Sequence, residues 1–219
     1  MSASLEEIIG YAFKDPALLT LALKHSSLEE ESYERLEFLG DRVLGLVIAE
    51  TLLALFPDEP EGALAKRLNA LVRRETLVMI AQDLTLSRFI QVSDTERTTG
   101  GHESENVQAD CVESLIGAVY LDGGFTSAHA FVKRLYEGRI DQNSAVPQDP
   151  KTSLQEWAQG RGLPVPDYEV IQREGPDHAP VFTVEVRVQG QHPESGVGPS
   201  RRHAEKEAAS KLLVRLREE

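Results

Sequence analysis

Three acidic residues lie within eight positions of a segment that the sequence predicts to be helical: Glu34, Glu37 and Asp41. At roughly 100° per residue, their side chains fall within an arc of about 60° on that helix. The other directions around the helix carry mainly apolar residues, a pattern typical of a buried helix. Buried carboxylates are unfavourable unless they are paired, hydrogen-bonded or bound to metal. The segment is therefore a candidate for metal-dependent chemistry.

A second acidic pair lies in a similar setting further along the chain. Asp110 and Glu113 are three residues apart and share one face of a predicted helix that is also apolar almost all round. If the two helices pack together, four or five carboxylates converge, and each raises the pKa of the others unless divalent cations separate them. Hard oxygen ligands of this kind suit Mg²⁺ or Mn²⁺. The chemistry that such a cluster serves is metal-assisted hydrolysis of a phosphodiester.

The same acids have an interpretation without metal. Glu34 or Glu37 could pair with a neighbouring arginine on a solvated edge, and Asp110 could cap its helix. Glu34 is the weakest candidate ligand, because an acid in the first turn of a helix is favoured by the helix dipole anyway. The six histidines form no pair at ligand spacing, which argues against a zinc site.

A basic pair stands at the start of the last predicted helix. Arg201 and Arg202 follow Ser200, and the backbone N–H groups and dipole of a helix start also favour anions. The pattern predicts a phosphate-binding helix start. The alternative is an ordinary solvated helix start, since Glu205 and Glu207 follow closely.

Composition restricts the class of protein. The 219 residues are 41% hydrophobic and carry a net charge of −13, which argues weakly against simple electrostatic binding of nucleic acid. A local basic patch or bound cations can reverse the potential where it matters. The single cysteine, Cys111, excludes an intramolecular disulfide and is predicted to be a small buried residue. No apolar run of transmembrane length and no signal segment is present, so we expect a soluble, cytoplasmic protein with no membrane partner.

The hydrophobic pattern predicts helix after helix in the first part of the chain and no strand before residue 165. The acidic helix is expected near 33–55, and a single helix over 62–84. A polar stretch over 93–106 is expected to be a loop. A further helix is expected from 107 to 121, ended by the glycines that follow, and a last one over 125–139.

The pattern changes beyond residues 138–150, which have the composition of a linker. A short helix is expected over 152–159, and alternating apolar residues at 182–188 predict a half-buried strand with a partner at 168–171. A third strand within 190–199 is poorly marked, because Pro193 and Pro199 both lie in that stretch. An alanine-rich and leucine-rich stripe predicts a final helix.

Two long motifs resemble the acidic signatures of the ribonuclease III family: ERLEFLGD at 34–41 and ADCVESLIGA at 109–118. Residues 150–217 resemble the double-stranded RNA-binding domain of that family. The resemblance, which covers nearly the whole chain, implies an all-α endonuclease domain followed by a small α+β (α-β-β-β-α) RNA-binding domain. The expected bounds are 1–140 for the endonuclease domain, 141–148 for the linker and 149–218 for the RNA-binding domain.

The family resemblance implies a Mg²⁺-dependent endoribonuclease, with Mn²⁺ able to substitute, that cleaves both strands of double-stranded RNA. The products would carry 5′-phosphate and 3′-hydroxyl ends, and the expected roles are in rRNA and mRNA processing and decay. The motifs imply Asp41 and Glu113 as catalytic residues and metal ligands at Glu37, Asp110 and Glu113. Glu61 matches a further family ligand less securely, because Glu59 stands nearby.

The same resemblance implies a homodimer, with Phe38 in the position of an aromatic side chain that inserts into the partner subunit. An ordinary core phenylalanine is the alternative. In the small domain it implies contacts with duplex RNA from one set of residues: Thr152, Gln155, Glu156, His178, Ser200, Arg201 and Arg202. Such domains recognise the shape of A-form RNA more than its sequence.

One competing class is a non-catalytic double-stranded RNA-binding protein that keeps the fold. A protein of that class would be expected to have lost metal-binding acids, whereas Glu37, Asp41, Asp110 and Glu113 are all present. A metal-dependent hydrolase of small nucleotides is disfavoured by the appended RNA-binding domain.

Overall fold

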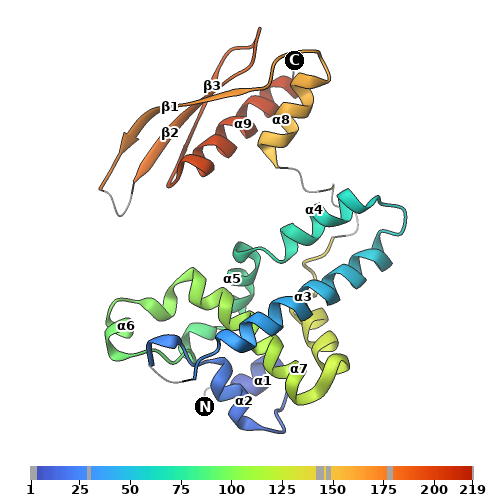
Figure 1. Ribbon diagram of the computed structural model, residues 1–219, viewed down its shortest axis with the longest axis vertical. Helices are drawn as coiled ribbons and strands as arrows, with labels where there is room; N and C mark the ends of the chain where they lie inside the picture. The colour runs from blue at the N-terminus through green and yellow to red at the C-terminus, as the bar shows by residue number, and fades with distance from the viewer. Residues whose placement is uncertain (1–3, 29–30, 142–145, 147–148, 177–179, 219) are drawn as a thin grey trace. The chain divides into compact units, whose positions relative to one another are not determined.

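The computed structural model describes residues 4–28, 31–141, 146, 149–176 and 180–218. The chain divides into two compact units, Met1–Val146 and Pro147–Glu219, called here the first and the second unit. The first unit is helical and the second combines helices with a three-stranded sheet, which confirms the predicted fold class (Figure 1). Most of the expected linker at 141–148 lies outside the described residues.

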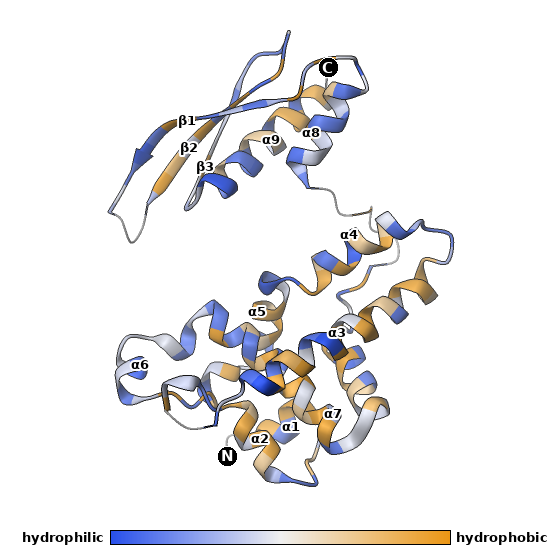
Figure 2. Cartoon of the chain, viewed as in Figure 1, coloured by the Kyte–Doolittle hydropathy of each residue, from blue (hydrophilic) through white to orange (hydrophobic). Residues whose placement is uncertain are grey.

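The described part of the first unit contains α-helices joined by turns of 3₁₀ helix, with the following bounds: α1 (Leu5–Ile9), α2 (Pro16–Ala22), η1 (Ser26–Leu28), α3 (Glu34–Leu55), α4 (Glu61–Leu71), α5 (Arg74–Asp83), η2 (Leu86–Arg88), α6 (Asp94–Thr98), η3 (Gly101–Glu103) and α7 (Glu105–Leu135). The long helices α3 and α7 form the most extensive pair and carry much of the apolar core (Figure 2). Among the described residues, no helix is both long and apolar enough to cross a membrane.

Helix α7 confirms the predicted break after residue 121. Its backbone leaves the helical region at Gly124, where φ is +73°, a conformation that favours glycine. Just before the break, the carboxylate of Asp122 accepts hydrogen bonds from the Tyr11 hydroxyl at 2.6 Å and from the backbone N–H of Asp15 at 2.9 Å. These bonds join the segment between α1 and α2 to the break in α7.

Two expectations for the first unit are wrong. The single helix over 62–84 is split, because the backbone at Arg73 is extended and the Thr76 hydroxyl donates a hydrogen bond to the carbonyl of Ala70. No glycine or proline marks this break, so the apolar pattern runs through it. The stretch 93–106 is not simply a loop, since Ser93 caps a short helix with its side chain and α7 already begins at Glu105.

Helix α3 also differs from its prediction as a helix buried almost all round. Phe38, Leu46 and Leu53 are 67%, 57% and 62% exposed and lie along one side of the helix. The guanidinium of Arg42 stands 5.5 Å from the centre of the Phe38 ring on the same side. We call the three apolar residues the α3 stripe. The side of α3 opposite to it packs in the core.

The second unit has the order α8 (Pro150–Gln159), β1 (Asp167–Glu174), β2 (Val181–Arg187), β3 (Glu194–Gly198) and α9 (Arg201–Glu218). The strands form an antiparallel sheet in the order β1-β2-β3. Helix α9 packs on β2 and β3 and against α8, so both helices lie on one side of the sheet (Figure 1). Leu154, Val186 and Leu212 are central to the small core between them.

The poorly marked third strand is present, and both prolines lie just outside it. Its signal is weak because glycines occupy the positions that face α9. A Cβ at Gly196 would lie 2.3 Å from the carbonyl oxygen of Ala204, and one at Gly198 would lie 2.9 Å from the backbone nitrogen of the same residue. Close packing on the helix therefore replaces the apolar alternation that identifies β2.

Candidate metal centre and RNA-binding surface

Helices α3 and α7 cross at two glycines. A Cβ at Gly40 would lie 1.7 Å from the carbonyl oxygen of Glu113, and one at Gly117 would lie 2.2 Å from the carbonyl oxygen of Leu36. Only hydrogen fits at either position, so the two backbones are in direct contact. We call this contact the glycine crossing. Because the acidic residues of both helices flank it, it brings them together.

Three carboxylates converge beside the glycine crossing. One carboxylate oxygen each from Glu37, Asp110 and Glu113 lies within 4.8 Å of the others, and all three side chains are half-buried. The set consists of hard oxygen donors only, which is what Mg²⁺ and Mn²⁺ prefer. We call it the carboxylate group.

Electrostatics at this group are strongly unfavourable without a cation. Burial, followed by the negative charges of Asp41, Glu37 and Asp110, raises the pKa of Glu113 to about 8. Burial and neighbouring acids also raise the pKa of Glu37. Burial raises the pKa of Asp110, although the Tyr33 hydrogen bond and nearby positive charges oppose it. A group of acids that resists ionisation in this way fits a divalent cation well.

Asp41 lies beside the carboxylate group but is not one of its three members. Its side chain is 39% exposed and forms an ion pair with Arg42. Its charge nevertheless contributes to the raised pKa of Glu113, which shows that the two carboxylates are close. Asp41 is thus a partly exposed acid whose charge acts on the group.

Tyr33 was not predicted as a site residue. Its phenol is buried and donates a hydrogen bond of 3.4 Å to a carboxylate oxygen of Asp110. A tyrosine before an acidic motif gives no signal in a single sequence. The glycine crossing could have been found, because isolated glycines such as Gly40 and Gly117 inside strong helical patterns usually have a packing reason.

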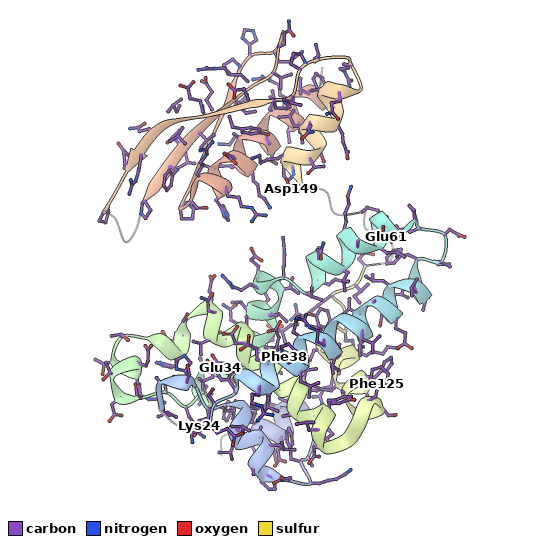
Figure 3. The ribbon with its side chains drawn as sticks, viewed as in Figure 1. Lys24, Glu34, Phe38, Glu61, Phe125 and Asp149 are labelled. Carbon is purple, nitrogen blue, oxygen red and sulfur yellow. The ribbon has the colours of Figure 1, made fainter. Side chains whose placement is uncertain are left out.

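The structure does not bring Glu61 to the carboxylate group. Glu61 is the exposed first residue of α4 and follows the far end of α3 (Figure 3). Since α3 has 22 residues, it is about 33 Å long, and Glu37 lies in its first turn. The role of Glu61 as a ligand stays a prediction. Phe38 points away from the core and belongs to the α3 stripe, so it is not an ordinary core residue.

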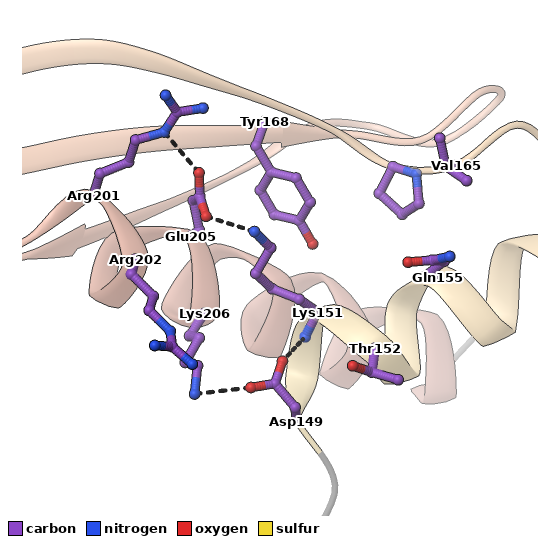
Figure 4. Close-up of a pocket in the computed structure, with 11 residues that line it drawn as sticks. Asp149, Lys151, Thr152, Gln155, Val165, Tyr168, Arg201, Arg202, Glu205 and Lys206 are labelled. Carbon is purple, nitrogen blue, oxygen red and sulfur yellow. Dashed lines mark hydrogen bonds and ion pairs between the residues drawn. The ribbon is translucent and has the colours of Figure 1, made fainter.

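The predicted RNA-contacting residues of the second unit gather around the starts of α8 and α9. Thr152, Gln155, Arg201 and Arg202 line one hollow of about 870 Å³ (Figure 4). Glu156 is exposed on the same helix, α8, but does not line the hollow, and Ser200 accepts a hydrogen bond from the backbone of α9. His178 lies outside the described residues.

The fold and the site together define a class of protein. An all-α unit presents a carboxylate group suited to divalent metal, and a separate α-β-β-β-α unit presents basic side chains at two helix starts. This combination is that of a metal-dependent nuclease that acts on duplex RNA.

Comparison with known proteins gives the family. A family model described as "Ribonuclease-III-like" matches residues 15–139, and one described as "Double-stranded RNA binding motif" matches 150–216. The chain is 48% identical to Ribonuclease 3 of Cereibacter sphaeroides, over 97% of this chain and 94% of that protein. It is 46% identical to Ribonuclease 3 of Ehrlichia chaffeensis, over 99% of this chain and 98% of that protein.

A solved nuclease domain of ribonuclease III from Campylobacter jejuni, described as flexible in a region involved in dimer formation, matches with a TM-score of 0.61. The two are 42% identical, over 62% of this chain and 96% of that chain. The chain therefore belongs to the ribonuclease III family and is a double-stranded-RNA-specific endoribonuclease that depends on divalent metal. Glu37, Asp41, Asp110 and Glu113, the acids that the two motifs assign to metal binding and catalysis, are all present, so nothing favours a non-catalytic relative.

Proposed function

We propose that Glu37, Asp110 and Glu113 hold Mg²⁺, with Mn²⁺ as a substitute, and that Asp41 and Glu113 are the catalytic residues. The observation that carries this proposal is the convergence of three carboxylate oxygens within 4.8 Å in a place where acids resist ionisation. When bound, the divalent ion supplies a more acidic water and neutralises charge on the phosphate.

The side chains of Glu113 and Asp41 then provide a metal ligand and a group that transfers protons. Glu113 gives up the proton that it holds in the metal-free protein, since only the carboxylate is a good ligand. Asp41 is partly exposed beside the group, where it can accept a proton from water and return one to the leaving oxygen. With the 3′-oxygen as the leaving group, attack of water on phosphorus breaks the P–O3′ bond and leaves a 5′-phosphate and a 3′-hydroxyl.

We assign catalysis to residues 1–140 and RNA binding to 149–218, joined by the linker 141–148. Thr152, Gln155 and Glu156 are exposed on α8, where they can reach the 2′-hydroxyls of the shallow minor groove. Ser200, Arg201 and Arg202 lie at the start of α9, where they can contact RNA phosphates. His178 is assigned to the same RNA-contacting set. The substrates are structured rRNA and mRNA in the cytoplasm.

We also propose that two copies of the chain assemble through the α3 stripe. The stripe exposes three large apolar side chains, Phe38, Leu46 and Leu53, on the helix that carries Glu37 and Asp41. Exposed apolar side chains grouped in this way are typical of an interaction site. The relative from Campylobacter jejuni is described as having a region involved in dimer formation, and two catalytic groups in one dimer would account for cleavage of both strands.

A cleavage assay on a long RNA duplex tests the metal site. We expect cleavage with Mg²⁺, none with a chelator, and 5′-phosphate ends in the products. Glu37→Gln should reduce cleavage by about 100-fold or more, because it removes a ligand charge. The matched control is Glu34→Gln, which changes the exposed first residue of α3. This variant should cleave the duplex at the wild-type rate. Equal activity of the two variants would rule out the carboxylate group as the metal site.

A further inference from the structure

A buried carboxylate stands in the wall of the RNA-facing hollow, where it should oppose RNA binding. Glu205 lies in the first turns of α9 and is only 8% exposed. It lines the same hollow as Thr152, Gln155 and Arg202 (Figure 4). A negative charge there repels phosphate and is costly to bury, so its presence requires a compensating role.

Each oxygen of Glu205 binds a different cation. Lys151 of α8 donates to one carboxylate oxygen at 2.5 Å, and the Arg201 Nε donates to the other at 2.8 Å. Burial alone would raise the pKa of Glu205, but the hydrogen bonds from these two cations lower it, so the group stays ionised. Lys151 also stands 4.5 Å from the centre of the Tyr168 ring. Glu205 thus joins the start of α8 to the start of α9.

The cations that line the hollow differ in what they are bound to. Lys151 and Arg201 are held by Glu205, and Lys206 forms an ion pair of 2.8 Å with Asp149. Among the described residues, the side chain of Arg202 has no ion pair or hydrogen bond, and it is exposed. Arg202 alone among these four cations can neutralise a phosphate without giving up an internal partner.

We propose that Glu205 is a positioning residue for duplex-RNA binding. It holds Lys151 and Arg201 so that the starts of α8 and α9 keep a fixed spacing, and Arg202 is the cation that neutralises a phosphate. The proposal rests on the RNA-contacting roles given to α8 and α9 above. It changes the expected roles of the two neighbouring arginines, because Arg201 becomes part of the internal support and Arg202 the phosphate contact.

The direction in which one substitution changes the affinity for RNA distinguishes a positioning role from simple electrostatic repulsion. Glu205→Gln removes a negative charge from an RNA-binding surface, so charge alone predicts tighter binding. Loss of positioning predicts weaker binding. We expect the full-length variant to bind a short RNA duplex about tenfold more weakly than the wild type in the presence of a chelator, measured by fluorescence anisotropy. Binding equal to or tighter than that of the wild type would overturn the proposal.

Glu207→Gln is the matched control. Glu207 is on the same helix but bonds Lys211 and the backbone N–H of Val197, away from the hollow. Its loss of charge should leave affinity within about twofold. A weakening equal to that of Glu205→Gln would mean that any charge change on α9 has this effect, and the proposal would fail.

A charge-neutral double variant keeps the test valid if Glu205→Gln lowers stability. Lys151→Met with Glu205→Gln keeps the wild-type net charge and removes the ion pair that joins α8 to α9, while Arg201 stays in place at the start of α9. Electrostatics predicts wild-type affinity and positioning predicts weaker binding, with the folded state checked through the fluorescence of Trp157, the only tryptophan. Wild-type affinity of this folded variant would refute the positioning role.

The phosphate contact has its own readout, distinct from the positioning role. Arg202→Gln should reduce the slope of log affinity against log salt by about one, whereas Arg201→Gln should weaken binding with less change in slope. An unchanged slope in Arg202→Gln would show that the phosphate assignment is wrong, even if Glu205→Gln weakens binding as expected.

Discussion

Glu113→Gln should stabilise the metal-free protein while it abolishes cleavage. Burial and the neighbouring acids raise the pKa of the Glu113 carboxyl group in the folded state from its ordinary value of 4.5 to about 8. The folded state therefore binds an additional proton between these values, and the stability of the wild type falls as the pH rises through that window. Glutamine imitates the protonated group at every pH, so the variant escapes this loss.

The size of the effect follows from the same pKa. At pH 7 the unfolded carboxyl is ionised and the folded one is largely protonated. The interval of about 2.5 units between the unfolded pKa and pH 7 corresponds to a loss of at most about 3.4 kcal/mol in the free energy of unfolding. Glu113 is only half-buried, so solvent screening reduces the expected gain to roughly 1–2 kcal/mol. At pH 5 the gain should almost vanish.

Urea unfolding of the full chain in a chelator measures this difference. Far-UV circular dichroism follows the helical first unit, and we expect the urea midpoint of Glu113→Gln to rise by about 0.5–1 M at pH 7. Trp157 lies in the second unit and is the only tryptophan. Its fluorescence transition should not move, which makes it an internal control.

The same urea unfolding measured with Mg²⁺ gives a second test. Mg²⁺ should raise the midpoint of the wild type, since a ligand that binds only the folded state stabilises it. The variant should respond much less. A variant that is less stable than the wild type at pH 7 in the chelator, or a gain that is the same at pH 5 and pH 7, would refute the explanation of the raised pKa.

The glycine crossing and the α3 stripe give two further predictions. Gly40→Ala should destabilise the first unit by about 3 kcal/mol or more, since its Cβ would meet the backbone of Glu113. The control Gly45→Ala should stabilise the unit by about 0.5–1 kcal/mol, because nothing lies within 4 Å of a Cβ at that position. Equal thermal stability of the two variants would show that the close crossing is wrong. Leu46→Glu should sediment as a monomer while the exposed control Gln82→Glu remains a dimer, and a dimeric Leu46→Glu would show that copies do not meet through the α3 stripe.

The sequence predicted the elements that repeat a simple pattern. The acidic helix α3, the strand β2 and the final helix were all found, because their apolar residues recur with the period of a helix or a strand. The break at Arg73 was missed, because it depends on a hydrogen bond from Thr76 to Ala70, which leaves no mark in the apolar pattern. Strand β3 was poorly defined because its inward positions are glycines fitted against α9.

The sequence pointed to the acidic residues of the candidate site but not to the side chains that hydrogen-bond or pair with them. Acids at helical spacing on two apolar helices predicted a shared group of four or five carboxylates. The family resemblance then pointed to Glu37, Asp110 and Glu113 as the ligands, and these are the three that the structure brings together. The hydrogen bond from Tyr33 to Asp110 and the ion pair of Asp41 with Arg42 depend on the side-chain conformations in the packed structure, which the sequence pattern does not show. The apolar pattern alone could not predict the exposure of Phe38, since an apolar residue gives the same pattern in a core and at a surface that another molecule covers; the family resemblance was what pointed to an exposed position.

The glycine crossing has a practical consequence for the study of natural substrates. Because backbone contact between α3 and α7 fixes the relative position of the acidic segments, exchange of an acid for its amide changes the chemistry and leaves the scaffold in place. Such a chain would still recognise its RNA through the second unit and would not release it as fragments. Variants of Glu37 or Glu113 could therefore serve as substrate traps, from which intact precursor RNAs are recovered and sequenced.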